Sequence, residues 1–248
     1  MRLTDRVYLV GSGANGFHIS HRVDCSVYVV DCGGPLAFID AGVGEYGTDV
    51  ILANLRLDGL DPAAATHLLI THKHADHCGG AAALHERLGV SVVASEHTAT
   101  AMRQGDEDAI SLRAAKDAGL YDRDYVFRAC PVDTVLADGD TLTVGGITFT
   151  MLDTPGHCAG HCAYTFSRGG KLHLFGGDNV FNGGKILLQN IPDCDLQAYF
   201  STVRRLAALP VDVFLPGHSM PCLREGHVHP RAAAARLDQL LAPEGMKG

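Results

Sequence analysis

Short apolar segments separated by polar or glycine-containing turns recur along the whole chain, a pattern typical of a mixed α/β protein. In the first half, strands are predicted at residues 7–10, 23–30, 36–39, 68–71 and 90–94. Helices are predicted near residues 48–57 and from Gly79-Gly80 to Leu88. The polar residues 96–118 are also predicted to be helical, either as a solvated pair of helices or as a cover over a functional site.

The second half of the chain has the same pattern of short apolar segments separated by turns. Its strands are predicted at residues 134–136, 141–144, 147–152, 162–166, 171–175, 186–188 and 211–215. Residues 195–209 read as an amphipathic helix, since Leu196, Tyr199, Val203, Leu206 and Leu209 recur at helical spacing. Pro230 opens a terminal helix, whose predicted inner face is Ala232 to Ala235, Leu237, Leu240 and Leu241. Two β-rich halves, each closed by helices, predict four layers in the order helices, sheet, sheet, helices.

Size and charge narrow the class of protein. The chain has 248 residues, 46% of them hydrophobic, and no evident linker, so we expect one domain over residues 1–248. The net charge is -8 and no basic run exceeds Arg204-Arg205, which argues against a nucleic acid as partner. A small-molecule substrate is the expected partner, and a homodimer is compatible with the sequence.

The N-terminal residues lead directly into a strand, without the charged and apolar segments of an export signal. No apolar run approaches the roughly 20 residues needed to cross a bilayer. We therefore expect a cytoplasmic protein without membrane contact, whose eight cysteines are reduced thiols.

The densest chemistry lies in residues 71–77, directly after an apolar run. His72, His74, Asp76 and His77 place three imidazoles and one carboxylate within six residues. These groups are the usual protein ligands of zinc and related divalent ions. Neighbouring residues of an extended loop point in different directions, so two adjacent ions fit this cluster better than one.

Further ligand types follow three later apolar segments. His157 comes after residues 147–152, Asp178 after residues 171–175 and His218 after residues 211–215, each beside glycine or proline. Metal-binding side chains at several strand ends are typical of a site assembled on one edge of a sheet.

With these residues in this order, the chain resembles the metallo-β-lactamase fold superfamily of dinuclear metallohydrolases. The resemblance extends from residues 27–30 and 38–42 through residues 215–219. It implies an α/β fold with a four-layer αββα sandwich. It also implies two divalent metal ions, with zinc expected and iron or manganese as alternatives.

The resemblance assigns a role to each ligand. His72, His74 and His157 would hold the first ion, Asp76, His77 and His218 the second, and Asp178 would bridge both. A metal-bridging hydroxide would then attack the carbonyl of a small ester, thioester or lactone. Asp76 is the candidate catalytic residue, orienting the hydroxide and passing its proton toward the leaving group, unless it serves only as a ligand.

Residues near the expected ligands have supporting roles. Asp40 would hold a histidine tautomer or order a loop, or else merely form a turn. His161 is expected to support the loop that carries His157. His18 and His21 would contact substrate or be plain loop residues, and His227 and His229 are expected in a surface turn near the mouth of the site.

The cysteines suggest two hypotheses. Cys158 and Cys162 are interpreted as small buried residues rather than as a separate zinc site. Because Cys78, Cys158 and Cys222 lie close in sequence to ligands, we expect activity to be sensitive to oxidation.

The choice of reaction depends on motifs within the superfamily. Asp178 and the missing export signal count against a true β-lactamase. Residues 154–157 and 175–181 resemble glyoxalase II (hydroxyacylglutathione hydrolase), although residues 219–248 are expected to be too few for its glutathione-gripping helical domain. Acyl-homoserine lactonases place a tyrosine where this chain has Phe181.

The sequence is compatible with several other reactions. A persulfide dioxygenase with a single iron would need only two of the histidines and an aspartate, and a β-lactam or phosphodiester hydrolase of this fold is also possible in principle. Some apolar residues would line an acyl pocket or belong to the core, namely Phe17, Phe181, Ile186, Leu187 and Leu188.

Overall fold

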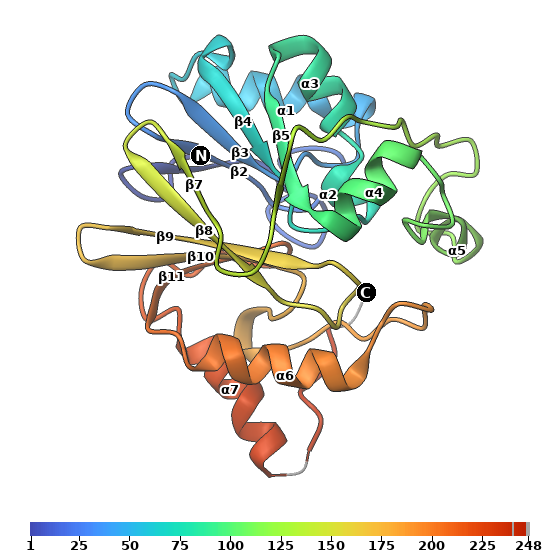
Figure 1. Cartoon of the computed structure of the whole chain (residues 1–248), viewed down its shortest axis with the longest axis vertical. Coiled ribbons are helices and arrows are strands. Elements are labelled where there is room, and N and C mark those ends of the chain that lie inside the picture. The colour runs from blue at the N-terminus through green and yellow to red at the C-terminus, as the bar shows by residue number, and fades with distance from the viewer. Residues whose placement is uncertain (240, 247–248) are drawn as a thin grey trace.

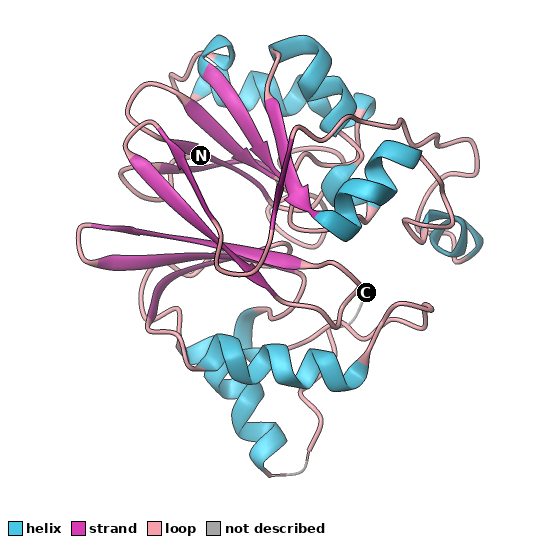
Figure 2. Cartoon of the chain, in the orientation of Figure 1, coloured by secondary structure: helices cyan, strands magenta, loops and turns pink. Residues whose placement is uncertain are grey.

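Two β-sheets stacked face to face form the centre of the protein, and helices cover both outer faces (Figures 1 and 2). The structure is a computed structural model that describes residues 1–239 and 241–246. The predicted α/β sandwich of four layers is confirmed.

The first sheet has six strands in sequence order. They are β1 (Val7–Gly11), β2 (Val27–Asp31), β3 (Leu36–Ile39), β4 (Ala65–Leu69), β5 (Ser91–Ser95) and β6 (Thr134–Leu136). Strand β2 is antiparallel to both β1 and β3, and β3 to β6 are parallel. Helices α1 (Glu45–Leu57) and α3 (Ala81–Leu88) cover its outer face through buried residues such as Ile51, Leu55 and Leu84 (Figure 1).

The second sheet has five strands in the order β11-β10-β9-β8-β7. Their bounds are β7 Thr141–Val144, β8 Ile147–Asp153, β9 Cys162–Arg168, β10 Lys171–Gly177 and β11 Val211–Pro216. Helices α6 (Leu196–Ala207) and α7 (Val228–Asp238) cover its outer face (Figure 1). Asp195 caps α6 by accepting hydrogen bonds from the main-chain N–H groups of Gln197 and Ala198.

The central core lies between the two sheets. Alternate residues of the strands point into it, so that Tyr28 and Ile39 of the first sheet meet Phe149, Tyr164 and Phe175 of the second. This apolar layer fixes the relation of the two sheets and thereby of the loops at their ends. Within the described chain, none of the helices combines the length and apolar character that a bilayer crossing requires.

Three predicted elements of the first half begin three or more residues away from the predicted position. β2 begins at Val27, not 23, because the Asp24 carboxylate accepts hydrogen bonds from the His21 and Val43 N–H groups and shapes a turn. α1 begins at Glu45, not 48, and the Thr48 hydroxyl lies inside its first turn. β4 spans Ala65–Leu69, not 68–71, since the Thr71 N–H donates to the Asp40 carboxylate.

The predicted helical stretch 96–118 is two helices. α4 (Glu96–Gln104) ends at Gly105, which adopts φ 66°, and α5 (Leu112–Asp117) follows after a turn. The short helices α2 (Ala75–Cys78), η1 (Pro62–Ala64) and η2 (Asn182–Gly184) were not predicted. Of these three, only α2 lies within the metal-binding motif.

Two predictions for the second half of the chain are wrong. Residues 186–188 form no strand, and Ile186 makes only an isolated bridge with Gly245. α7 begins at Val228 rather than Pro230, and its buried face is Ala233 and Leu237. Of the other predicted inner residues, Ala234 is partly buried, Ala232, Ala235 and Leu241 are exposed, and Leu240 lies outside the described residues.

Candidate metal centre

The loops at the strand ends bring the predicted ligands together. His72 and His74 follow β4, and Asp76 and His77 lie on α2. The other three follow β8, β10 and β11 and are His157, Asp178 and His218. Their ligand atoms fall into three overlapping groups whose members lie within 4.8 Å of one another, namely His72/His74/His157, His72/His77/Asp178 and Asp76/His77/His218.

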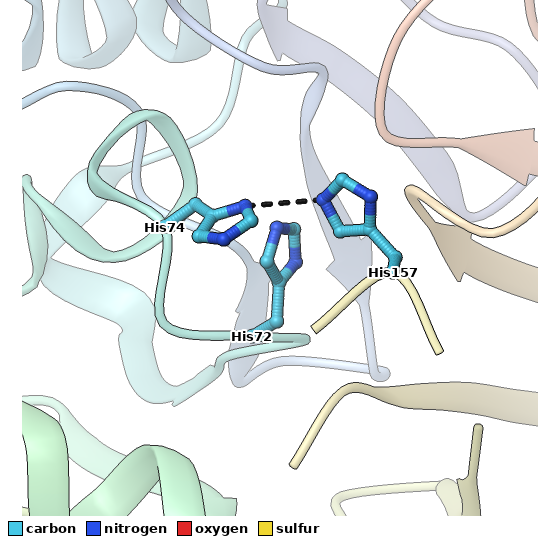
Figure 3. Close-up of side chains that lie close together, drawn as sticks. All are labelled: His72, His74 and His157. Atoms are coloured by element: carbon cyan, nitrogen blue, oxygen red, sulfur yellow. Dashed lines mark hydrogen bonds between the residues drawn. The ribbon is translucent and has the colours of Figure 1, made fainter. Parts of the chain in front are cut away.

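The first group consists of three imidazoles from two loops. His74 Nδ1 lies 3.0 Å from His157 Nε2, and Figure 3 shows the three rings pointing toward one another. The His72 ring centroid is 4.7 Å from that of His74 and 5.1 Å from that of His157. Three nitrogens that converge in this way match the three protein ligands of a catalytic zinc site.

The second group contains a carboxylate and two imidazoles. Asp76 Oδ2 lies 3.0 Å from His218 Nε2 and 3.5 Å from His77 Nε2. Asp178 lies between the two groups: its Oδ1 is 3.3 Å from His77 Nε2, and its Oδ2 is 3.4 Å from His218 Nε2 and 3.8 Å from His157 Nε2. This placement supports the bridging role predicted for Asp178.

Several buried atoms in the cluster are left without a hydrogen bond of ordinary geometry within the described chain. They are Nε2 of His72, His74 and His77, and Oδ1 of Asp178. Leaving such atoms unpaired costs about 1–3 kcal/mol each, so buried polar groups of this kind normally have a partner. Nitrogen and carboxylate donors aimed at common points suit divalent transition metals, and the residues therefore fit a pair of ions.

Burial sets the protonation of the first group. It holds the pKa values of His72 and His157 below the ordinary range, and with the neighbouring His157 it lowers the pKa of His74 to about 3. The three imidazoles are therefore neutral at physiological pH, as metal binding requires.

In the second group, the pKa values of the histidines are raised instead of lowered. Burial lowers the pKa of His218, but the facing Asp178 and Asp76 carboxylates more than offset it and raise the pKa to about 9. Burial likewise opposes charging of His77, whose pKa is raised well above the usual value by surrounding acidic groups, including Asp178, Asp76 and Asp40. In the metal-free protein, protons on these two histidines thus balance the carboxylates.

Metal loading should consequently release protons. At pH 7 we expect about two protons per chain, because His77 and His218 must deprotonate to bind an ion. Metal affinity should rise with pH through about 9, the pKa of His218, and the raised pKa of His77 adds to this rise. Calorimetric titrations in buffers of different ionisation enthalpy measure the release, and a value near zero would contradict this protonation scheme.

Asp40 contacts a predicted ligand directly. It follows β3 with φ 61°, its Oδ2 accepts from His77 Nδ1 at 2.8 Å, and its Oδ1 accepts from the Thr71 N–H at 2.8 Å. The contact keeps a proton on Nδ1 of His77 and turns Nε2 toward the cluster, which agrees with the tautomer-holding interpretation.

His161 supports the loop, as predicted, rather than offering a ligand atom. Its Nε2 accepts from the Asp178 N–H at 3.0 Å, and its Nδ1 lies 2.9 Å from the Thr154 hydroxyl. Both ring nitrogens are therefore occupied by the protein. The contact with the Asp178 main chain also helps to fix the end of β10.

The remaining histidines lie outside the ligand groups. His18 is exposed and His21 lines a cavity, in a loop joined to the His218 loop by a hydrogen bond from the Ser219 N–H to the Asn15 carbonyl. His227 lies in the turn directly before α7, as predicted, whereas His229 lies in the first turn of the helix. There His227 Nδ1 is near the Val211 carbonyl and His229 Nδ1 accepts from the Gly183 N–H.

The cysteines near the centre are shielded. Cys158 and Cys162 are buried, as predicted. Burial raises the pKa values of Cys78 and Cys158 well above the ordinary thiol value, which disfavours the reactive thiolate. Cys222 is partly exposed, and its Sγ donates to the Arg224 carbonyl. These environments argue against the predicted sensitivity to oxidation at Cys78 and Cys158.

Sequence reasoning missed two contacts of the centre. The Tyr121 hydroxyl donates to Asp76 Oδ1 at 3.1 Å. Lys73, between two predicted ligands, is buried, and its Nζ lies 2.8 Å from Asp193 Oδ2 and 3.3 Å from His97 Nε2. The position of Lys73 between two predicted ligands could have indicated a buried ion pair. The sequence around Tyr121 has no pattern that indicates a contact with the metal centre.

Comparison with known proteins identifies the family. The family model described as the metallo-beta-lactamase superfamily matches residues 22–218. The chain belongs to this superfamily, as its motifs suggested.

The curated relatives include proteins named as a hydroxyacylglutathione hydrolase and as a thioesterase. A hydroxyacylglutathione hydrolase of Cereibacter sphaeroides is 32% identical over 155 residues, covering 62% of this chain and 48% of that protein. A thioesterase of Emericella nidulans is 26% identical over 219 residues, covering 88% of this chain and 52% of that protein. The chain thus spans about half the length of these relatives.

Solved structures share the fold. The crystal structure of a subclass B3 metallo-beta-lactamase from Bradyrhizobium japonicum superposes with a TM-score of 0.72 at 23% identity, covering 97% of this chain and 92% of that one. At this level of identity the likeness concerns the fold alone.

Proposed function

We propose that the protein is a hydrolase that holds two divalent metal ions, zinc in the first instance, and cleaves a small thioester. The proposal rests on the position of the Asp178 carboxylate, within 3.3–3.8 Å of ring nitrogens from both histidine groups. The relatives named hydroxyacylglutathione hydrolase and thioesterase support a thioester as substrate.

When bound, such ions supply a water of lowered pKa and a Lewis acid for the scissile carbonyl. His72, His74 and His157 would hold one ion, Asp76, His77 and His218 the other, and Asp178 would be shared. The protein's own residues would provide proton transfer during the reaction. Asp76 is partly exposed, and its carboxylate would take the proton of the attacking water and return it to the departing thiolate.

Other substrates of the superfamily fit this chain less well. Phe181 stands where lactonases of this family have a tyrosine, and its buried ring lies 6.3 Å from that of His218 without offering a hydroxyl. Lactones therefore rank below thioesters. The β-lactamases found among similar structures share the fold alone and carry no argument for a β-lactam substrate.

A substrate panel tests the proposal. We expect the purified protein to hydrolyse acyl thioesters faster than lactones, aryl esters, β-lactams or phosphodiesters, to lose this activity with a chelator, and to regain it with zinc. Release of the free thiol measures turnover. Failure of a metal-loaded preparation to cleave any thioester would refute the proposal, and oxygen uptake with a persulfide would favour the dioxygenase instead.

A further inference from the structure

A cavity of about 190 Å³ lies beside the metal centre. The loop that carries Arg22 and Val23 forms one side of it, and residues 120–125 form the other. Val43 and Tyr125 are buried, whereas Leu120 is 54% exposed and Arg22 is open to solvent. The cavity is thus a pocket with an apolar floor and an open mouth.

Tyr121 connects this cavity with the predicted catalytic carboxylate. Its side chain lines the cavity, and its hydroxyl donates to Asp76 Oδ1 at 3.1 Å. The other carboxylate oxygen, Oδ2, faces His218. The Tyr121 side chain therefore contacts both the cavity and Asp76, which places the cavity one phenol ring away from this carboxylate.

The walls indicate which chemical group would fit. Val23, Val43 and Leu120 and the rings of Tyr121 and Tyr125 offer apolar and aromatic surface. A cavity of roughly 150 Å³ with apolar walls accommodates benzene, so this volume suits a group of about phenyl size. A short aliphatic chain would also fit.

The charges at the mouth restrict the ligand further. Arg22 lies 3.8 Å from Asp122, and both side chains are largely exposed. Asp124 adds a second acidic group to the lining. Asp122 and Asp124 contribute two negative charges to the rim and Arg22 one positive charge, and the whole chain has a net charge of -8. An anionic acyl group would be repelled.

We propose that this cavity binds the uncharged acyl group of the substrate, of up to about phenyl size, and that Tyr121 aligns Asp76 with it. Tyr121 is a positioning residue in this scheme, because it acts through the Asp76 carboxylate. The inference rests on the proposed thioesterase function and names its substrate class.

Thioesters of one common thiol test the pocket. With acetyl, butanoyl, phenylacetyl and succinyl groups, KM should fall as the neutral group grows, and succinyl should be the poorest substrate. Leu120→Trp narrows the mouth at an exposed position and should raise KM for the phenylacetyl thioester at least about tenfold more than KM for the acetyl thioester. Leu57→Trp is the matched control, since Leu57 is 85% exposed at the end of α1.

Tyr121→Phe tests the positioning role. It keeps the ring and removes the hydroxyl, so kcat should fall about 10- to 100-fold for every acyl group, with KM and metal content unchanged. Tyr164→Phe is its control, because that buried hydroxyl donates to the Ile70 carbonyl instead. Equal kcat values for the two variants would refute the role of Tyr121.

The outcomes separate the two proposals. A Leu120→Trp enzyme that slows acetyl and phenylacetyl thioesters alike would overturn the pocket assignment while thioester cleavage itself stands. If the metal-loaded wild type cleaves no thioester, calorimetric binding of neutral phenylacetamide decides the pocket separately. Binding to the wild type that Leu120→Trp weakens would support it, and absence of binding would reject it.

Discussion

Replacing Asp178 with alanine is expected to lower kcat/KM by about a thousandfold or more, because the variant loses the only carboxylate that faces His77, His157 and His218 among the described residues. Metal content should fall from about two ions to about one per chain. Steady-state assays and elemental analysis of the same preparation measure both effects. The fold should persist, since the side chain belongs to the site and not to the apolar core.

Asp153→Ala is the matched control for this variant. Asp153 also ends a strand of the second sheet, but its carboxylate is in none of the ligand groups of the described chain. This variant should keep wild-type metal content and activity. An Asp178→Ala protein that still held two ions and turned over substrate at the normal rate would show that the two groups work without a shared carboxylate.

Asp40→Asn should weaken metal binding by about 10- to 100-fold without contacting the ion. Asparagine tolerates the positive φ of 61° at this position and preserves size. If its carbonyl oxygen keeps the Thr71 hydrogen bonds, its amide group faces His77 Nδ1 and favours the tautomer with the proton on Nε2. That nitrogen could then no longer bind a metal.

Titration against a chelating dye measures the affinity of this variant. Asp24→Asn provides the comparison, because Asp24 is equally buried, accepts hydrogen bonds from the His21 and Val43 N–H groups, and belongs to none of the ligand groups of the described chain. It should leave metal affinity unchanged. Equal affinities for Asp40→Asn and wild type would mean that Asp40 merely forms a turn.

Much of the fold was predictable from the apolar segments, because each strand of the sandwich is buried on at least one face and therefore strongly patterned. β3 and β7 have the predicted bounds, and α6 buries Tyr199, Val203 and Leu206 at helical spacing. The ligand loops were predictable for a related reason. Polar side chains directly after buried strands are restricted to the sheet edge, where the strand ends meet.

The parts that the sequence did not reveal depend on contacts between distant segments. Tyr121 reaches Asp76 from a connection without regular structure, where no periodicity indicates which side chain points inward. The apolar residues 186–188 looked like a strand, yet the Leu187 carbonyl lies 3.3 Å from His157 Nδ1, so this segment serves the centre instead of a sheet. The local pattern of apolar and polar residues cannot distinguish a strand from a segment that contacts the metal centre.

The proposed mechanism requires these loops to hold two metal ions side by side. Anomalous diffraction at the zinc edge from crystals of the protein purified with its native metals, combined with elemental analysis, tests it directly. We predict two peaks about 3.5–4 Å apart, one among His72, His74 and His157 and the other among Asp76, His77 and His218. A single iron peak, or no peak after incubation with zinc, would contradict the account.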